Sequence, residues 1–325
     1  MERKVWIDYA KAIGITTVVM GHSVYTNPHI VSVIFLFHMP MFFFISGYLF
    51  NAKKSIADIT KSNLKTLLVP YILFNLILLG INVVQCGAKL MLTGVNSFQD
   101  NVLVPGFNAL CGFGGNLPVG TTWFLLALIW CKYILWMLVN GKRWQAALMV
   151  LAVVGVLMWY YQLGHPLPYC IETGCAGVFP FAAGYAFKRW GRQLEEFTRW
   201  KYLLSLVAGV AMVFVCYHYG AKVNYLAANF GGVLGVGATI GGIMSIFSIG
   251  KLLDCYPNKV IMKVSSASIL IMCMHQFVSR DVNHIFHYNE HLWLTLAGDL
   301  CNVALLTLLY PVVKKYWPAL IGNRK

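Results

Sequence analysis

The sequence predicts an all-α polytopic membrane protein, and its composition and the form of its apolar runs both point to that class. Of the 325 residues, 59% are hydrophobic and only 11% are charged. A soluble domain carries about 25% charged residues, so the composition excludes a large soluble core as the main feature of the chain. The apolar runs are continuous instead of alternating with polar residues, which favours helices over membrane β-strands.

About ten segments contain the roughly 20 mostly apolar residues that a membrane-spanning helix needs. We expect one integral membrane domain over residues 1–325, with helices near residues 8–26, 30–50, 67–86, 121–140, 145–162, 174–190, 202–219, 230–250, 264–286 and 292–313. The basic start MERK is followed by no convincing cleavage site, so the first segment is expected to stay as a signal anchor.

The basic residues predict which side of the membrane each loop faces. If the N-terminus is cytoplasmic, twenty of the 25 Lys and Arg residues fall on the inside, whereas only Lys89 and Lys222 fall in outside loops. Cytoplasmic loops are enriched in Lys and Arg, so both termini are expected in the cytoplasm. This topology also explains the formal net charge of +14, and we therefore expect no nucleic-acid partner.

The longest outside loop spans residues 87–120 and is rich in Gly, Asn and Pro. Its moderate hydrophobicity predicts a lid or a re-entrant turn, with a disordered connector as the alternative. The nine cysteines are scattered without paired metal-ligand spacing, so no metal site is expected. Cys170 and Cys175 share one predicted outside loop, where they either form a disulfide or stay reduced.

The first apolar segment carries three ionisable residues, Asp8, Lys11 and His22. Ionisable groups are costly in hydrocarbon and therefore mark candidate functional sites. Lys11 and His22 are eleven residues apart, so they share one helix face about 16 Å apart along the axis. Asp8 lies three residues before Lys11 and can pair with it. A buried neutral imidazole at His22 would suit a general base; the alternative is a packed, hydrogen-bonded histidine.

Two further histidines lie in predicted membrane helices. His38 precedes Pro40, and a proline inside a spanning helix is tolerated where a cavity or a neighbour compensates for the lost hydrogen bond. His275 lies near the middle of the ninth segment. We rank His38 below His22 for catalysis and expect His275 either to line a substrate path or to have a structural role.

Charged and aromatic residues are also expected near the outer surface. Arg280 and Asp299 lie at similar depth in the last two segments, so we predict an ion pair between them, with Asp281 as the competing partner of Arg280. Either pair would be structural or would bind sugar hydroxyls. Trp123 starts the fourth segment, where it either anchors the helix at the interface or stacks on a sugar.

Six blocks in the right order resemble the membrane-bound acyltransferase family 3 proteins, particularly sugar O-acetylases of the fucose 4-O-acetylase type. The first is a basic residue, ten residues and then His, matched by Lys11 and His22. The others are FHMPMFFFISGYLF, KTLLVPY, TTWFLLAL, FPFAAGY and SASILIMCMHQF. Together they cover nearly the whole chain.

The resemblance implies transfer of an acyl group from cytoplasmic acyl-CoA, usually acetyl-CoA, to a hydroxyl of a cell-surface glycan or lipid-linked sugar in the bacterial inner membrane. In that setting His22 would be the general base or a transient acyl carrier, and we favour the base. Lys11, held by Asp8, would stabilise an oxyanion or a CoA phosphate. The expected donor-binding residues are Lys53, Lys54, Lys61 and Lys65, although each could serve topology alone. His38, Trp123, His275, Arg280 and Asp299 are the expected acceptor-binding residues.

Two other classes of function compete with acyl transfer. A transporter or flippase for a glycan or lipid precursor would also carry intramembrane charges, but it usually shows paired broken helices, and this sequence shows no such symmetry. A membrane-embedded structural or sensor protein would not require the spacing between Lys11 and His22. Besides the bilayer, the sequence leaves a homodimer open.

Overall fold

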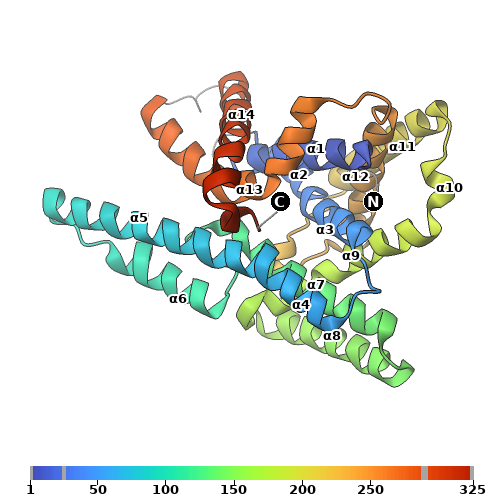
Figure 1. Ribbon diagram of the computed structural model, residues 1–325, viewed down its shortest axis with the longest axis horizontal. Coiled ribbons are helices and arrows are strands. Elements are labelled where there is room, and N and C mark those ends of the chain that lie inside the picture. Colours follow the sequence, from blue (N-terminus) through green and yellow to red (C-terminus); the bar gives the residue numbers. More distant parts are fainter. Residues whose placement is uncertain (1–2, 24–26, 287–291, 323–325) are drawn as a thin grey trace. The chain divides into compact units, whose positions relative to one another are not determined.

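The computed structural model describes residues 3–23, 27–286 and 292–322 (Figure 1). The described residues form helices joined by loops, and their only β-type pairing is an isolated bridge between Asn224 and Asn229. Within them, eight helical runs are long and apolar enough to cross a membrane. The predicted all-α polytopic membrane fold is therefore confirmed.

The chain divides into two compact units, and each is described here by itself. Unit 1 contains Met1–Phe50 and Phe179–Pro311, and unit 2 contains Asn51–Val178 and Val312–Lys325. Two helices, α9 (Ile171–Trp190) and α14 (Leu292–Tyr316), contribute residues to both units.

Unit 1 is built around the first helix, α1 (Val5–Gly21). This helix packs against α12 and α13 and also meets α2 and α3. Its apolar side chains Trp6, Ile7 and Ala10 join a buried cluster with residues of α3 and α12. The helices of unit 1 besides α1, α9 and α14 are α2 (Pro28–Phe35), α3 (His38–Leu49), α10 (Arg192–Glu195), α11 (Arg199–His218), η5 (Tyr225–Ala227), α12 (Gly232–Leu252) and α13 (Lys259–Phe286).

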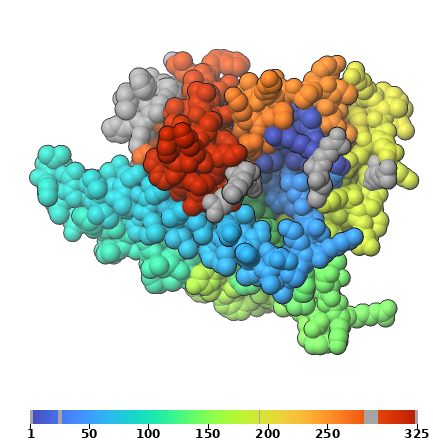
Figure 2. Space-filling model, viewed as in Figure 1, coloured from blue at the N-terminus to red at the C-terminus, as the bar shows by residue number. Residues whose placement is uncertain are grey.

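Unit 2 contains a helical run from Ile56 to Thr93, 38 residues long. Figure 2 shows its C-terminal part, α5, on the viewed face in light blue to cyan. Apolar side chains of α5 such as Leu76 are exposed, as expected for contact with lipid. The helices of unit 2 besides α9 and α14 are α4 (Ile56–Asn63), η1 (Leu64–Leu68), α5 (Val69–Thr93), η2 (Gln99–Leu103), α6 (Val104–Cys111), η3 (Gly120–Thr122), α7 (Trp123–Asn140), α8 (Arg143–Leu163), η4 (Pro168–Cys170) and η7 (Pro318–Ile321).

The predicted helix at 30–50 is interrupted, and its two parts are α2 and α3. The break falls at Leu36 and Phe37, so Pro40 lies in the first turn of α3, where a missing N–H costs little. The carbonyl of Leu36 accepts a hydrogen bond from the Thr239 hydroxyl of α12 at 3.0 Å, which satisfies a group that the break leaves without a helical partner.

The segment expected as a loop at 87–120 is largely helical. The α5 helix continues to Thr93, and η2 and α6 then pack against it, with the Tyr71 hydroxyl donating to the Ala109 carbonyl at 2.8 Å. The segment therefore returns along α5 as an ordered hairpin, in place of the disordered connector that was the alternative.

Two of the ten predicted spans, 8–26 and 174–190, are not among the eight long apolar runs. The first corresponds to α1, which has 17 residues and includes Asp8 and Lys11. The second corresponds to α9, which carries Glu172, Lys188 and Arg189 in its end turns. The α1 helix falls short in length, and the charged and polar residues of α9 lower its hydropathy.

In unit 1, α3 and α9 cross with their backbones in contact. A Cβ atom on Gly47 would lie 1.8 Å from the Phe181 carbonyl oxygen, and one on Gly184 would lie 1.9 Å from the Phe44 carbonyl oxygen. Each helix therefore presents a glycine to the backbone of the other. Small residues allow this close approach, which increases packing between membrane helices.

Gly47→Ala is expected to lower the free energy of unfolding by about 1–3 kcal/mol, because the new methyl group forces the helices apart. The measurement is thermal unfolding of the detergent-solubilised protein. Gly155→Ala in α8 is the matched control, since no atom lies within 4 Å of its added Cβ. Equal melting temperatures for the two variants would contradict the proposed role of this crossing.

Candidate active site

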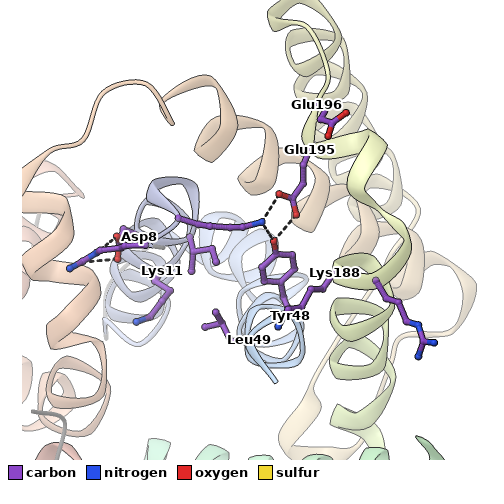
Figure 3. A pocket seen from close by; sticks show the side chains of 11 residues that line it. Asp8, Lys11, Tyr48, Leu49, Lys188, Glu195 and Glu196 are labelled. Atoms are coloured by element: carbon purple, nitrogen blue, oxygen red, sulfur yellow. Dashed lines mark hydrogen bonds and ion pairs between the residues drawn. The ribbon is translucent and has the colours of Figure 1, made fainter. Parts of the chain in front are cut away.

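A pocket of about 770 Å³ opens beside the N-terminal end of α1. Its walls come from α1, the end of α3, the end of α9 and the α10 segment (Figure 3). Five cationic side chains line it, opposed by three carboxylates: Arg3, Lys4, Lys11, Lys188 and Arg189, with Asp8, Glu195 and Glu196. The excess of positive charge makes this pocket suited to an anionic ligand.

The Asp8 carboxylate is held by two side chains. It accepts hydrogen bonds from Arg3 at 2.6 Å and from the Ser265 hydroxyl at 2.7 Å. Lys11, the predicted partner of Asp8, donates to the backbone carbonyl of Ser265 at 2.9 Å. Ser265 of α13 therefore contacts both residues, and the direct pair of Asp8 with Lys11 stays a prediction. The hydrogen bonds from Arg3 to Asp8 also raise the pKa of Arg3.

A second polar group closes another side of the pocket. Lys4 bonds to the Tyr48 hydroxyl and forms an ion pair with Glu195 at 2.6 Å. The Tyr48 hydroxyl in turn donates to the other Glu195 carboxylate oxygen at 2.5 Å (Figure 3). The Nζ atom of Lys188 lies 6.0 Å from the centroid of the Tyr48 ring. These contacts link the chain start, α3, α9 and α10.

At the other end of α1, three imidazoles lie together. His22 caps α1, and its ring centroid is 5.3 Å from that of His275 and 6.3 Å from that of His38. His38 and His275 are each 1% exposed. The structure therefore brings together all three of the histidines predicted from the sequence, and places them in unit 1.

The Nδ1 atom of each of these imidazoles lies near a carbonyl one helical turn earlier. The distances are 2.8 Å from His22 to Val18 and 2.9 Å from His38 to Ile34. The corresponding distance from His275 to Ile271 is also 2.9 Å. A carbonyl oxygen accepts and cannot donate, so each Nδ1 carries the hydrogen in the neutral ring. Nε2 is then the nitrogen that can accept a proton.

Asp299 and Asn302 of α14 border the histidine cluster. Asp299 is fully buried and has Ser23, the residue after His22, beside its carboxylate. Asn302 donates to the His275 carbonyl at 2.9 Å and to the Ser279 hydroxyl at 2.8 Å. The sequence predicted an ion pair of Arg280 with Asp299 or with Asp281. The side chains of residues 280 and 281 lie outside the described ones, so both pairs stay predictions.

The predicted residues of unit 2 occupy separate positions on that unit. The side chains of Lys53, Lys54, Lys61 and Lys65 are all exposed. Trp123 is 7% exposed and packs edge-on against Phe124, with 6.0 Å between the ring centroids. This burial fits a packing role within unit 2 better than an open stacking surface for a sugar.

The cysteines of the described residues are all free, including Cys170 and Cys175. The Cys170 thiol donates to the Gly112 carbonyl at 3.2 Å. Across the part of the chain that the structure describes, no group of three His, Cys, Asp or Glu residues is placed to hold a metal ion.

A cation-lined pocket and a cluster of three imidazoles thus lie at opposite ends of α1. The chain belongs to the acyltransferase 3 family, because the family described as acyltransferase domain matches residues 4–317. The resemblance seen in the sequence is thereby confirmed, and the protein is a membrane acyltransferase. Comparison with curated proteins and with solved structures found no match.

Sequence reasoning missed most of the pocket. The residues it did not identify are Arg3, Lys4, Tyr48, Lys188, Arg189, Glu195, Glu196 and Ser265. The four cationic residues among them also fit the positive-inside pattern, and the other four carry no sequence signal, so only their meeting in space distinguishes them. Arg3 offers the clearest missed signal, since a basic residue five positions before Asp8 competes with Lys11 for the carboxylate.

Ser265→Ala is expected to destabilise the protein by about 1–3 kcal/mol, because it removes a hydrogen bond to the buried Asp8 carboxylate. The Lys11 contact survives, since Lys11 binds the backbone of Ser265. Ser266→Ala is the matched control, because the Ser266 hydroxyl bonds only within its helix, to the Met262 carbonyl. Thermal unfolding in detergent compares the two, and a larger loss for Ser266→Ala would contradict the role given to Ser265.

Proposed function

We propose that the protein transfers an acetyl group from cytoplasmic acetyl-CoA to a hydroxyl of a cell-surface glycan or lipid-linked sugar. The observation that carries this proposal is the layout of α1, which has a cation-lined pocket at one end and His22 at the other. Family membership supports acyl transfer as the reaction. The acetyl donor, the sugar acceptor and the bacterial inner membrane are further parts of the proposal.

The pocket of unit 1 is the proposed site for the phosphates of the donor. CoA carries several negative charges, and cations in a partly enclosed pocket bind phosphate well. Lys11 lines this pocket, about 16 Å along the helix from His22. That separation supports a role for Lys11 at a CoA phosphate and argues against the alternative role at an oxyanion beside His22.

The lysines of unit 2 keep a proposed part in donor binding. Lys53, Lys54, Lys61 and Lys65 are exposed, follow the positive-inside pattern and can attract an anionic donor over several ångströms. To them the pocket adds Arg3, Lys4, Lys188 and Arg189 as proposed donor-binding residues.

His22 is the proposed general base. Its Nε2 takes the proton of the acceptor hydroxyl, and the oxygen then forms a bond with the thioester carbonyl carbon. The carbon–sulfur bond breaks, CoA leaves as a thiolate, and the sulfur takes the proton from His22. The Nδ1 hydrogen bond to the Val18 carbonyl keeps the ring oriented throughout, as base catalysis requires.

The acceptor is proposed to bind beside the three imidazoles. His38 and His275 supply buried ring edges there, and Asp299 supplies a buried carboxylate near Ser23. Sugar hydroxyls both donate and accept hydrogen bonds, so such a polar cluster suits them. Arg280 completes the proposed acceptor residues, while the burial of Trp123 gives it the weakest support of the set.

His22→Ala is expected to reduce acetyl transfer at least about a hundredfold, because general base catalysis contributes rate factors of that size or more. The measurement uses radiolabelled acetyl-CoA with membranes that contain the enzyme and its native acceptors. Label in the glycan and lipid fraction is counted together with free CoA.

The control is His29→Ala, which changes a histidine of α2 whose ring contacts Tyr217, outside the cluster. Full transfer activity in the His22 variant would overturn its assignment as base. A wild-type protein that releases no CoA in the presence of these membranes would overturn acetyl-CoA as the donor.

Lys188→Gln is expected to raise the KM for acetyl-CoA about tenfold without changing the maximal rate, because one charge-assisted bond to a phosphate contributes roughly 1.5–3 kcal/mol. The matched control is Lys201→Gln, since Lys201 of α11 packs over Phe197 and is not part of the pocket lining. An equal rise in both variants would indicate general surface charge in place of a specific pocket.

A further inference from the structure

His275 is a buried imidazole in which one ring nitrogen forms hydrogen bonds and the other has no hydrogen-bond partner among the described residues. Its Nδ1 donates between the carbonyl oxygens of Ile271 and Met272, both at 2.9 Å. Its Nε2 is buried and has no hydrogen-bond partner among the described residues. A buried acceptor without a donor is unfavourable, so this atom points to a donor that the resting protein does not supply.

A neighbouring group able to become such a donor is His22. The two ring centroids are 5.3 Å apart, and His22 also has its Nδ1 committed, to the Val18 carbonyl. Two neutral rings that each present a bare Nε2 cannot bond to each other, because neither has a hydrogen to offer. When His22 has taken a proton, its Nε2–H becomes a donor and His275 Nε2 is an acceptor beside it.

The position of His275 is fixed by α14. Asn302 donates to the His275 carbonyl and to the Ser279 hydroxyl, which lies one turn later on α13. These two bonds join α13 to α14 at the level of the imidazole cluster. The His275 ring is therefore held by its own helix through Nδ1, and the His275 backbone is held by the Asn302 side chain.

Other titratable groups lie near the cluster. His38 lies farther from His22, at 6.3 Å between centroids, and packs edge-on against Phe35. Asp299 has Ser23 near its carboxylate, and both of its carboxylate oxygens are buried without a hydrogen-bond partner among the described residues. His275 is preferred because its ring lies beside that of His22, at 5.3 Å between centroids. The side chains of residues 280 and 281 are outside the described ones.

We propose that His275 is a positioning residue for acyl transfer, which accepts a hydrogen bond from protonated His22 and holds the transferred proton in place. The inference rests on the proposed role of His22 as general base. The acceptor oxygen–hydrogen bond breaks and a nitrogen–hydrogen bond forms at His22 Nε2. That hydrogen then bonds to His275 Nε2 while the oxygen attacks the thioester, and it leaves for the CoA sulfur when the carbon–sulfur bond breaks. His275 forms and loses only a hydrogen bond.

The test compares two amide substitutions of the same histidine. His275→Gln carries its amide tip to the position of Nε2, so it can still accept a hydrogen bond there. His275→Asn is shorter, keeps a donor for the Ile271 carbonyl and removes the acceptor at Nε2. The measurements are the maximal rate and KM with radiolabelled acetyl-CoA in acceptor-containing membranes, together with the melting temperature of each purified variant.

The expected result is a maximal rate within threefold of wild type for His275→Gln and at least tenfold lower for His275→Asn, with the KM for acetyl-CoA unchanged. A purely structural role predicts the reverse order, because Asn retains the backbone bond, and that outcome would overturn the proposal. If His22→Ala is inactive while His275→Asn transfers at the wild-type rate, this inference alone fails. If His22→Ala is fully active, the proposed base fails.

A second measurement does not depend on activity or on the folding of a variant. Solid-state nitrogen NMR of wild-type protein labelled in histidine reports which ring nitrogen carries the hydrogen. At neutral pH, His275 is expected to carry it on Nδ1 and to have a bare Nε2. Hydrogen on Nε2 of His275 in the resting enzyme would overturn the proposal whatever the kinetic result.

Discussion

The polar face of α1 is the constraint on which unit 1 depends. A helix surrounded by other helices in an apolar environment must find a partner for each polar side chain, because hydrocarbon provides none. Ser265 meets this need at one level by joining Asp8 through its hydroxyl and Lys11 through its carbonyl. At the opposite end, the turn of helix before His22 supplies the partner itself. The pairing of α1 with α13 is therefore specified by polar groups as well as by apolar packing.

The same requirement explains other contacts far from the proposed chemistry. In unit 2, Lys132 lies inside an apolar helix and donates to the Asn63 side chain at 3.0 Å. Asn75 donates to the Thr122 hydroxyl and accepts from the Val119 N–H, so a buried amide joins α5 to the start of α7. Both pairs satisfy a polar group and also fix which helices are neighbours.

The sequence predicted the fold class and the order of the helices well, because continuous apolar runs and basic loops are local signals. It also selected His22, His38 and His275, which the structure places together, since an ionisable group in an apolar run is conspicuous. It did not predict that Arg3 and Ser265 bind the Asp8 carboxylate, because the Ser265 contact depends on where α13 lies beside α1. It also missed Tyr48 and Glu195, which are 147 residues apart and whose pairing depends on where α10 lies beside α3.

The crossing of α3 and α9 determines which wall of the pocket beside α1 is held by backbone packing. Gly47 precedes Tyr48 on α3, and Gly184 lies one turn before Lys188 on α9. The pocket-lining side chains of Tyr48 and Lys188 therefore extend from two helices whose backbones are in contact. Separating those helices would open an empty seam between them. The α10 wall is joined to the rest by Glu195 through an ion pair and a hydroxyl bond, which exchange readily with water or phosphate. One wall of the pocket is therefore held by backbone packing, and the α10 wall is held by polar contacts.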